Sequence, residues 1–300
     1  MLNLDRLLLL QELHRRGSVI AVGAALSFSP STVSHQLKVL EREVGSTLTE
    51  RVGRGIRLTR EGEILAEHAV RIFGEIEQAE AAVAAVRSVP AGDVRVAALQ
   101  TASLALLPRA IEALERRSPH PRTFVSRIEP HRALGALAAR EFDIVIGEEY
   151  PGLVIAAVPG IERRPLVEDR LVLASPAGRG DAIVTGTADA LPWVMEPLGS
   201  HARSWCLAMC RRLGVDPEVR YESDDLLVQL RLVETGHAVA ILPKLLLDSE
   251  GAAAERTELP GRPTRSVFTA HRTGSDRTPA VRAVLDALEE AAAASAMDEL

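Results

Sequence analysis

The stretch SVIAVGAALSFSPSTVSHQLKVLEREVG, residues 18–45, decides the fold of the N-terminal part of this chain. It contains two helical patterns joined by a short turn. The second pattern begins at Ser29 and Pro30, because a serine hydroxyl can accept a hydrogen bond from a free backbone N–H, and proline suits the first helical position. Gly45 ends this pattern. The stretch therefore predicts a helix-turn-helix.

The second of these helices has two contrasting faces. Val33, Leu37, Leu40 and Val44 recur at spacings of four, three and four residues, which places them on one face. The opposite face carries hydroxyl, imidazole and cationic groups, which can reach base edges and phosphates in the DNA major groove. Taken alone, this face is more typical of an ordinary solvated helix, because serine and lysine are common on protein surfaces. Its members are Ser31, His35, Lys38 and Arg42.

The residues that follow favour DNA binding over the solvated helix. Residues 51–58 predict a small hairpin with a glycine turn, a wing whose arginines reach the phosphate backbone or the minor groove. A solvated hairpin with incidental charge is the alternative. The chain carries a net charge of −6, yet residues 1–60 hold nine cations and five carboxylates, about +4. This local excess of positive charge is typical of a surface that faces phosphates.

A helix over 4–16 and a slim helix over 19–26 precede the recognition helix, and a long helix begins at Thr59. Its apolar residues predict a heptad seam along a rod about 40 Å long. Such a seam favours pairing with a second copy of the chain, although packing on the chain's own C-terminal domain is the alternative. The seam comprises Leu58, Leu65, Ala69, Ile72, Ile76, Ala79, Val83 and Val86.

From residue 94 the pattern changes to short apolar strands that alternate with helices, which predicts a largely parallel sheet. We expect strands over 94–99, 123–128, 144–146, 155–158, 166–175, 193–195, 219–222, 239–242 and 266–270. The expected fold is α/β overall, with an all-α winged helix-turn-helix (1–58), a linker helix (59–89) and a two-lobed effector domain (90–300). Lobe 1 takes about 91–163 and 266–300, and lobe 2 takes about 164–265.

Composition excludes several classes of protein. No apolar run is long enough to span a membrane, and the N-terminus lacks the pattern of a secretion signal. Two cysteines indicate a reducing compartment and no disulfide framework. The sequence contains no Gly-x-Ser-x-Gly elbow and no phosphate-binding loop ending in Gly-Lys-Ser. We therefore expect a protein that is not an enzyme and that needs no cofactor or metal.

Residues 1–86 closely resemble the DNA-binding half of LysR-type transcriptional regulators. The resemblance rests on residues of the helix-turn-helix, the wing and the start of the linker helix: Ala24, Ala25, Leu26, Ser29, Ser34, Leu37, Leu40, Glu41, Glu43, Gly45, Leu48, Glu50, Arg51, Gly53, Arg54, Leu58, Thr59 and Gly62. The remainder is similar to the family's periplasmic-binding-protein-like effector domain, including Phe142-Asp143-Ile144 and Gly236…Leu242-Pro243. That half is more variable and less specific.

The resemblance implies a cytoplasmic transcription factor. It would bind an inverted repeat in double-stranded DNA as a homodimer or a homotetramer, and change the DNA bend when a small effector binds. RNA polymerase would be a further partner, and no membrane is involved. The implied DNA contacts are Pro30, Ser31, Thr32, Ser34, His35 and Lys38 on the recognition helix and Arg51, Arg54 and Arg57 on the wing. The implied dimer contacts are Leu65, Ala69, Ile72, Ile76, Ala79 and Val83.

Three positions depart from the family pattern. Val19 and Thr49 stand where an aromatic residue is usual, which suggests a slightly repacked winged domain. Proline is at position 30, one residue before its frequent place in the family, where this chain has Ser31. This shift affects the expected base contacts but not the docking mode.

Two turns have the chemistry of an effector site, because helix N-termini offer free N–H groups to anionic ligands. Gln100, Thr101 and Ser103 lie in the first turn, and Ser200 and His201 lie in the second. The family resemblance places both turns at the cleft between the lobes and implies a small effector of unknown identity, for which the free N–H groups suit an anion. The alternative is that the hydroxyls are plain helix caps. Two positions are possible for Glu196: it faces the cleft, or it is a solvated loop carboxylate.

Cys206 and Cys210 lie one turn apart on one helix, so a metal site or a redox switch is an alternative to buried packing beside Trp205 and Met209. The spacing favours packing.

Two rival functions also remain at this point: a constitutive DNA-binding protein whose C-terminal domain only oligomerises, and an enzyme or solute-binding protein with an appended regulatory head.

Overall fold

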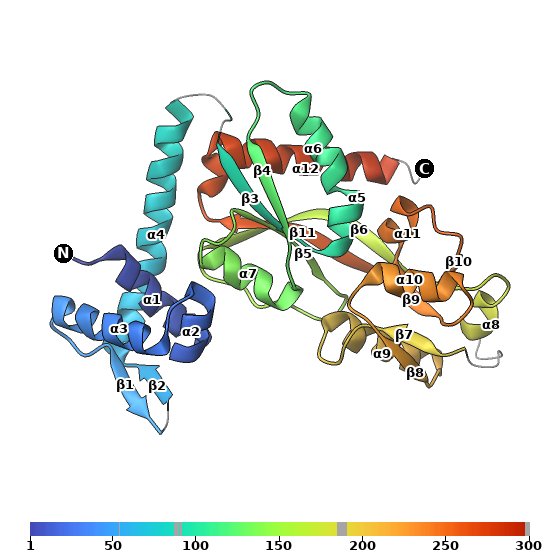
Figure 1. The fold of residues 1–300 in the computed structure, drawn as a ribbon, viewed down its shortest axis with the longest axis horizontal. Helices are drawn as coiled ribbons and strands as arrows, with labels where there is room; N and C mark the ends of the chain where they lie inside the picture. Colours follow the sequence, from blue (N-terminus) through green and yellow to red (C-terminus); the bar gives the residue numbers. More distant parts are fainter. Residues whose placement is uncertain (54, 87–89, 91, 185–190, 298–300) are drawn as a thin grey trace.

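The computed structural model describes residues 1–53, 55–86, 90, 92–184 and 191–297. A small N-terminal domain and a larger C-terminal domain are connected by one long helix, α4 (Arg60–Val86). Figure 1 shows α4 as a rod, with the small domain at the end where the helix begins. In the part of the chain that the structure describes, no helix is both long enough and apolar enough to cross a membrane.

The N-terminal domain has the predicted helix-turn-helix and wing. Its helices and hairpin are α1 (Leu4–Arg16), α2 (Val19–Leu26), α3 (Pro30–Val44), β1 (Thr49–Val52) and β2 (Gly55–Leu58). Asn3, Ser18 and Ser29 each cap a helix with a side-chain oxygen, as polar residues at these positions do. Gly17 and Gly45 end α1 and α3 in the left-handed conformation that glycine adopts without strain.

The core of this domain is a cluster of leucine and valine side chains from α1, α3 and the segment after α3. Leu10, Val33 and Leu40 are fully buried in it. Two glycines permit close packing around the cluster. A Cβ atom at Gly23 would lie 2.6 Å from the carbonyl oxygen of Phe28, and one at Gly62 would lie 2.1 Å from that of Leu48. Both positions therefore require glycine.

The predicted seam of α4 is divided between two environments. Near the start of the helix, Ala69 is buried in the core of the N-terminal domain, and Leu65 and Ile72 pack against that core. The expectation that Ala69 contacts a second copy of the chain is therefore wrong, because its own domain already covers it. Towards the end of the helix, Ala79 is exposed, Val83 is 68% exposed and Val86 is 85% exposed.

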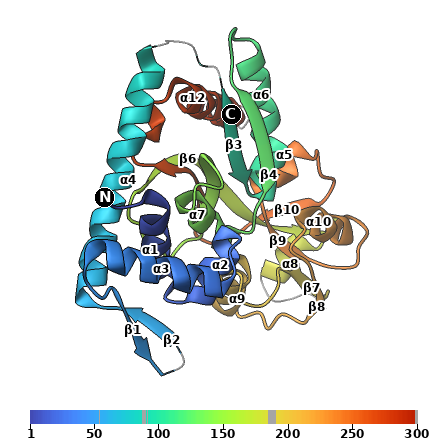
Figure 2. The same cartoon turned by 60° about the vertical axis from the view of Figure 1, so that its left-hand side comes forward.

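The C-terminal domain combines a central sheet with helices on both faces, as Figures 1 and 2 show. Its elements are β3 (Asp93–Ala98), α5 (Gln100–Ala105), α6 (Leu107–Glu115), β4 (Arg122–Arg127), α7 (Pro130–Ala138), β5 (Ile144–Glu149), β6 (Ile161–Ser175), α8 (Gly180–Val184), β7 (Trp193–Met195), α9 (His201–Leu213), β8 (Val219–Glu222), α10 (Leu226–Glu234), β9 (Ala240–Pro243), α11 (Lys244–Ser249), β10 (Glu255–Glu258), β11 (Thr264–Arg272), the 3-10 helix η1 (Ser275–Arg277) and α12 (Pro279–Met297).

The main sheet has the strand order β10-β6-β11-β5-β3-β4, with β9 also paired to β6. Strands β3, β4 and β5 are parallel, as predicted, because helices connect them. The expectation of a largely parallel sheet is nevertheless wrong. β11 is antiparallel to both β5 and β6, and β6 is antiparallel to β9 and β10. The two strands that link the lobes run in opposite directions, so the sheet is mixed.

The long strand β6 passes through both lobes. Up to Arg170 it pairs with β11, and from Leu171 it pairs with β9 and β10. In lobe 1, α5, α6 and α12 share one apolar core, and α7 contributes to another. Residues 155–158 form no strand, which corrects the expectation. Ile155 and Val158 pack instead against the core that includes α7.

Candidate functional site

The recognition helix α3 presents its polar face to solvent. Ser31, Thr32, His35 and Lys38 are exposed and Ser34 is half-buried, while Val33 and Leu37 on the other face are buried. The Ser29 Oγ accepts a hydrogen bond from the Thr32 N–H at 3.0 Å. It also lies within hydrogen-bond distance of the Ser31 and Thr32 hydroxyls. The start of the helix is therefore fixed where the hydroxyl groups cluster.

Glu41 connects α3 to the wing. Its Oε1 accepts hydrogen bonds from the Leu48 N–H, the Thr49 N–H and the Thr49 hydroxyl at 2.9–3.0 Å. Its Oε2 accepts a hydrogen bond from Lys38 at 2.6 Å. Although burial opposes the shift, these donors lower the pKa of Glu41. Thr49, where the family usually has an aromatic residue, is thus a buried hydrogen-bond donor.

The wing is the hairpin β1–β2, which extends from the end of α3. Arg51 and Arg57 are exposed on it, and Arg57 forms an ion pair with Glu50 across the hairpin at 2.6 Å. Arg54 lies outside the described residues. Exposed guanidinium groups beside an exposed hydroxyl-bearing helix can contact phosphates on either side of a groove.

A cavity of about 300 Å³ lies between the lobes of the C-terminal domain. Gln100 spans the gap between them. Its amide nitrogen donates to the Asp225 carboxylate at 2.7 Å, and its Oε1 accepts from the Leu226 N–H at 2.9 Å. The Gln100 hydrogen bond lowers the pKa of Asp225. The cavity is lined by Leu99, Gln100, Thr101, Arg127, Ile128, Glu129, Pro130, Glu148, Glu196, Asp224, Leu226 and Arg265.

Only part of the predicted effector set reaches this cavity. Gln100 and Thr101 line it, and Thr101 is fully buried with no hydrogen-bond partner for its Oγ1 among the residues that the structure describes. Ser103 instead donates to the Leu99 carbonyl oxygen at 3.0 Å. Ser200 caps α9 by accepting from the Arg203 N–H at 3.0 Å, and His201 is exposed. Neither Ser103, Ser200 nor His201 is part of the described cavity lining.

Sequence reasoning missed the charged centre of the cavity. Arg265 is 1% exposed, and its Nη2 lies 2.7 Å from the Asp169 carboxylate, while its Nη1 pairs with Glu148. These partners are 96 and 117 residues away in the chain, so no local pattern links them. Glu196, for which the sequence allowed either a cleft-facing or a solvated position, lines the cavity. Burial, followed by the charge of Glu148, raises the pKa of Glu196 to about 7.

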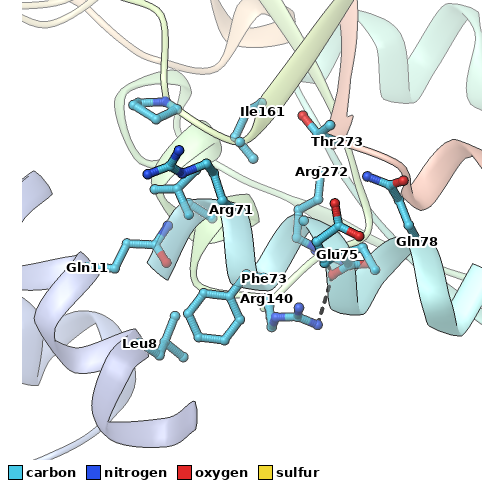
Figure 3. Close-up of a pocket in the computed structure, with 16 residues that line it drawn as sticks. Leu8, Gln11, Arg71, Phe73, Glu75, Gln78, Arg140, Ile161, Arg272 and Thr273 are labelled. Atoms are coloured by element: carbon cyan, nitrogen blue, oxygen red, sulfur yellow. Dashed lines mark hydrogen bonds and ion pairs between the residues drawn. The ribbon is translucent and has the colours of Figure 1, made fainter. Parts of the chain in front are cut away.

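A second cavity, of about 350 Å³, lies where α1, α4 and the C-terminal domain meet. Figure 3 shows Leu8 and Gln11 of α1 on one side of it and Phe73 and Arg140 nearby. Part of its lining is a cluster of ion-paired side chains. Glu77 of α4 pairs with Arg272 at 2.7 Å and with Arg140 at 2.9 Å. These contacts attach the linker helix to lobe 1 of its own chain through a residue that lies outside the predicted apolar seam.

Cys206 and Cys210 are buried in the lobe 2 core, which also contains Trp205 and Met209. Burial raises the pKa of both thiols, that of Cys210 to about 11. A protonated thiol is a poor nucleophile and a poor metal ligand. Within the described ranges, no group of three or more His, Cys, Asp or Glu side chains is placed to hold a metal ion.

Comparison with known proteins identifies both halves of the chain. Residues 4–63 match the family model of the bacterial regulatory helix-turn-helix protein, lysR family, and residues 67–293 match that of the LysR substrate binding domain. The chain is 25% identical over 294 residues to the uncharacterized HTH-type transcriptional regulator YfiE of Escherichia coli, an alignment that covers 96% of this chain and 98% of YfiE.

Two solved structures have a similar fold over nearly the whole chain. A full-length OxyR variant from Pseudomonas aeruginosa aligns with a TM-score of 0.62 and 21% identity, covering 96% of this chain and 95% of that one. Full-length CbnR complexed with its target DNA aligns with a TM-score of 0.53 and 20% identity, covering 97% and 100%. Because the two lysR models together span almost all of the sequence, the chain belongs to the LysR family of DNA-binding transcriptional regulators with an effector-binding domain.

Proposed function

We propose that this regulator binds an inverted-repeat operator as a homodimer that assembles into a homotetramer, and that a small molecule in the inter-lobe cavity changes how it bends DNA. The observation that carries the proposal is the exposed hydroxyl and cationic face of α3 beside the wing arginines. A duplex has two equivalent half-sites when its sequence is an inverted repeat, which suits two copies of one recognition helix.

The DNA-facing residues have distinct roles in this proposal. Lys38, Arg51 and Arg57 set affinity and its salt dependence through phosphates, since each phosphate contact releases counterions. Ser31, Ser34 and His35 discriminate between bases, because their short polar groups reach base edges. Pro30 and Thr32 contact the backbone at the helix start, and we retain Arg54 as a third wing contact.

Two apolar surfaces support assembly. On α4, Ala79 and Val83 are exposed, and Ile76 is half-buried. We assign these residues, together with the edges of Leu65 and Ile72, to the contact between two linker helices. On the outer strand β4, Phe124 is 50% exposed. An exposed apolar edge strand offers a second contact between copies, as a tetramer requires.

We further infer that the protein acts in the cytoplasm, with RNA polymerase as a partner at the promoter, and that it has no catalytic activity of its own. The junction of Glu77 with Arg272 and Arg140 supports a direct mechanical route from the effector domain to α4. A movement between the lobes would reach the DNA-binding domain through these ion pairs.

Gel-shift titration tests the DNA interface. An operator selected from random duplexes by the wild-type protein should bind the double variant His35→Ala, Lys38→Ala at least tenfold more weakly, because a base contact and a phosphate contact are lost. Arg220→Ala, which removes a cation from the exposed strand β8, is the matched control and should bind normally. Unchanged affinity in the double variant would refute the assignment of α3.

A further inference from the structure

The inter-lobe cavity carries more negative than positive side chains. Its charged lining consists of four carboxylates and two guanidinium groups. Both guanidinium groups already have carboxylate partners. Arg265 is held by Glu148 and by Asp169, the latter at 2.7 Å. The four carboxylates are Glu129, Glu148, Glu196 and Asp224.

The second guanidinium group, that of Arg127, also has partners within the protein. Arg127 donates to the Asp224 carbonyl oxygen at 2.9 Å, and its guanidinium lies 3.8 Å from the carboxylate of the same residue. An anionic ligand would therefore have to displace a carboxylate from one of these two arginines. Such displacement is costly at Arg265, because its ion pairs are buried in a poorly polar environment. Arg127 and Asp224 are 47% and 69% exposed, so their ion pair opposes an anion much less.

Two side chains that line the cavity, Thr101 and Glu196, can accept hydrogen bonds from a ligand, although Glu196 already accepts one from the Ser200 hydroxyl. Thr101 is fully buried, and its Oγ1 has no hydrogen-bond partner among the described residues. Glu196 lies on the opposite lobe, directly after β7. Nearby, Arg203 donates to the main-chain oxygen of Glu196 at 2.8 Å and to Glu222 at 3.1 Å. No ion pair to the Glu196 carboxylate is found in the part of the chain that the structure describes.

We propose that the inter-lobe cavity binds a small organic cation, an alkylammonium or guanidinium compound, whose N–H groups donate to Glu196 and to Thr101. This deepens the proposed function and rests on it. It also replaces the anionic effector that the sequence implied. A ligand held by Thr101 from lobe 1 and Glu196 from lobe 2 would draw the two lobes together, which gives the cation a direct effect on domain geometry.

The proposal has a defined pH dependence. The groups that act on Glu196 are Glu148 from β5, Arg265 from β11, Asp224 before α10 and Ser200 at the start of α9. Burial raises the pKa of Glu196 to about 7, so the carboxyl is largely neutral at pH 6 and largely ionised at pH 8. A cation needs the ionised form, so its affinity should rise about tenfold across this interval.

Calorimetric titration of the full-length protein tests the ligand class with probes matched in size. We expect 2-phenylethylammonium and n-butylammonium to bind, 2-phenylethanol and 1-butanol to bind at least tenfold more weakly, and phenylacetate and butyrate to show no binding. Glu196→Gln should weaken ammonium binding at least tenfold and abolish its pH dependence. Thr101→Val, a substitution of similar volume, should weaken binding while keeping the pH dependence.

Glu168→Gln is the matched control, because it removes one carboxylate from exposed β6 outside the cavity and should leave binding unchanged. Tighter binding of the carboxylates than of the ammonium probes would overturn the inference, and so would the absence of ammonium binding at 10 mM. Operator binding is measured on the same preparation. Intact operator binding without ammonium binding rejects only the ligand class, whereas loss of operator binding rejects the proposed function.

Discussion

At the scale of single residues, Glu41 joins the two parts of the DNA-binding surface. Its carboxylate accepts three hydrogen bonds from Leu48 and Thr49 at the base of the wing and one from Lys38 on α3. If either the carboxylate or its donors are removed, the polar groups that remain lose their hydrogen-bond partners. The relative position of recognition helix and wing therefore depends on this one side chain.

Glu41→Ala should lower the free energy of unfolding by about 1–3 kcal/mol, because several hydrogen bonds to a charged acceptor are lost. The stability contributed by Glu41 also depends on pH. Since its pKa is lower in the folded protein, the contribution is present above the ordinary carboxyl pKa and disappears as the pH falls through the lowered value. Urea unfolding of wild type and variant at pH 7 and at pH 3 measures both effects.

Glu50→Gln provides the control, because Glu50 is exposed on the wing and pairs only with exposed Arg57 among its described contacts. Its stability should stay within about 0.5 kcal/mol of wild type. If Glu41→Ala is as stable as this control at neutral pH, the wing is held by other contacts.

At the scale of elements, α4 serves two purposes along its length. Its first half completes the core of the DNA-binding domain through Ala66 and Ala69. Its second half leaves apolar side chains exposed, with Val83 at 68%. Substitutions at the buried positions of the first half therefore report on folding, whereas substitutions at the exposed apolar positions of the second half report on assembly.

The double substitution Ala79→Asp, Val83→Asp should convert the assembled protein to a smaller species without unfolding it, because both positions are exposed within one chain. Two buried carboxylates in a helix-helix contact are strongly unfavourable. Light scattering after gel filtration measures the mass. Ala85→Asp, exposed on the opposite side of this helix, is the matched control and should keep the wild-type mass. A double variant that keeps the wild-type mass would exclude this face of α4 from the contact.

At the scale of the whole molecule, polar contacts between described residues help to attach the DNA-binding unit to lobe 1. Glu77 of α4 pairs with Arg272 and Arg140, and Arg15 of α1 donates to the Gly135 carbonyl oxygen at 3.3 Å. Arg272 also pairs with Asp143 at 2.9 Å, so the cluster extends to the turn before β5. The cavity beside it in Figure 3 leaves room for small shifts of α4.

Glu77→Ala should separate the unfolding of the two domains. Loss of two ion pairs to a largely buried carboxylate should weaken the junction by about 1–3 kcal/mol. Scanning calorimetry should then show the DNA-binding domain melting before the effector domain, whereas we expect a single transition for wild type. Glu80→Ala, exposed on the same helix, should melt like wild type. Identical traces for both variants would mean that the domains are coupled elsewhere.

The bounds of α1, α2 and α3 and the presence of the wing could be predicted because their signals are local, although the hairpin begins at Thr49 rather than at residue 51. Helix caps, terminal glycines and the spacing of apolar residues act within a few positions of each other. The same is true of the parallel β3, β4 and β5, which short helices connect. Gln100 and Thr101 could be named as cavity-lining candidates for the same reason, since both follow directly after a predicted strand.

The sequence alone determined the helix-turn-helix, its exposed polar face and the alternation of β3, β4 and β5 with helices, since neighbouring residues fix these features. Only the tertiary structure decided that β6 and β11 run antiparallel, that Ala69 is covered by its own domain, and that Arg265 meets Glu148 and Asp169. The physical reason is chain separation. Contacts between residues about a hundred positions apart depend on how whole elements pack, and no local pattern encodes which charges that packing will bring together.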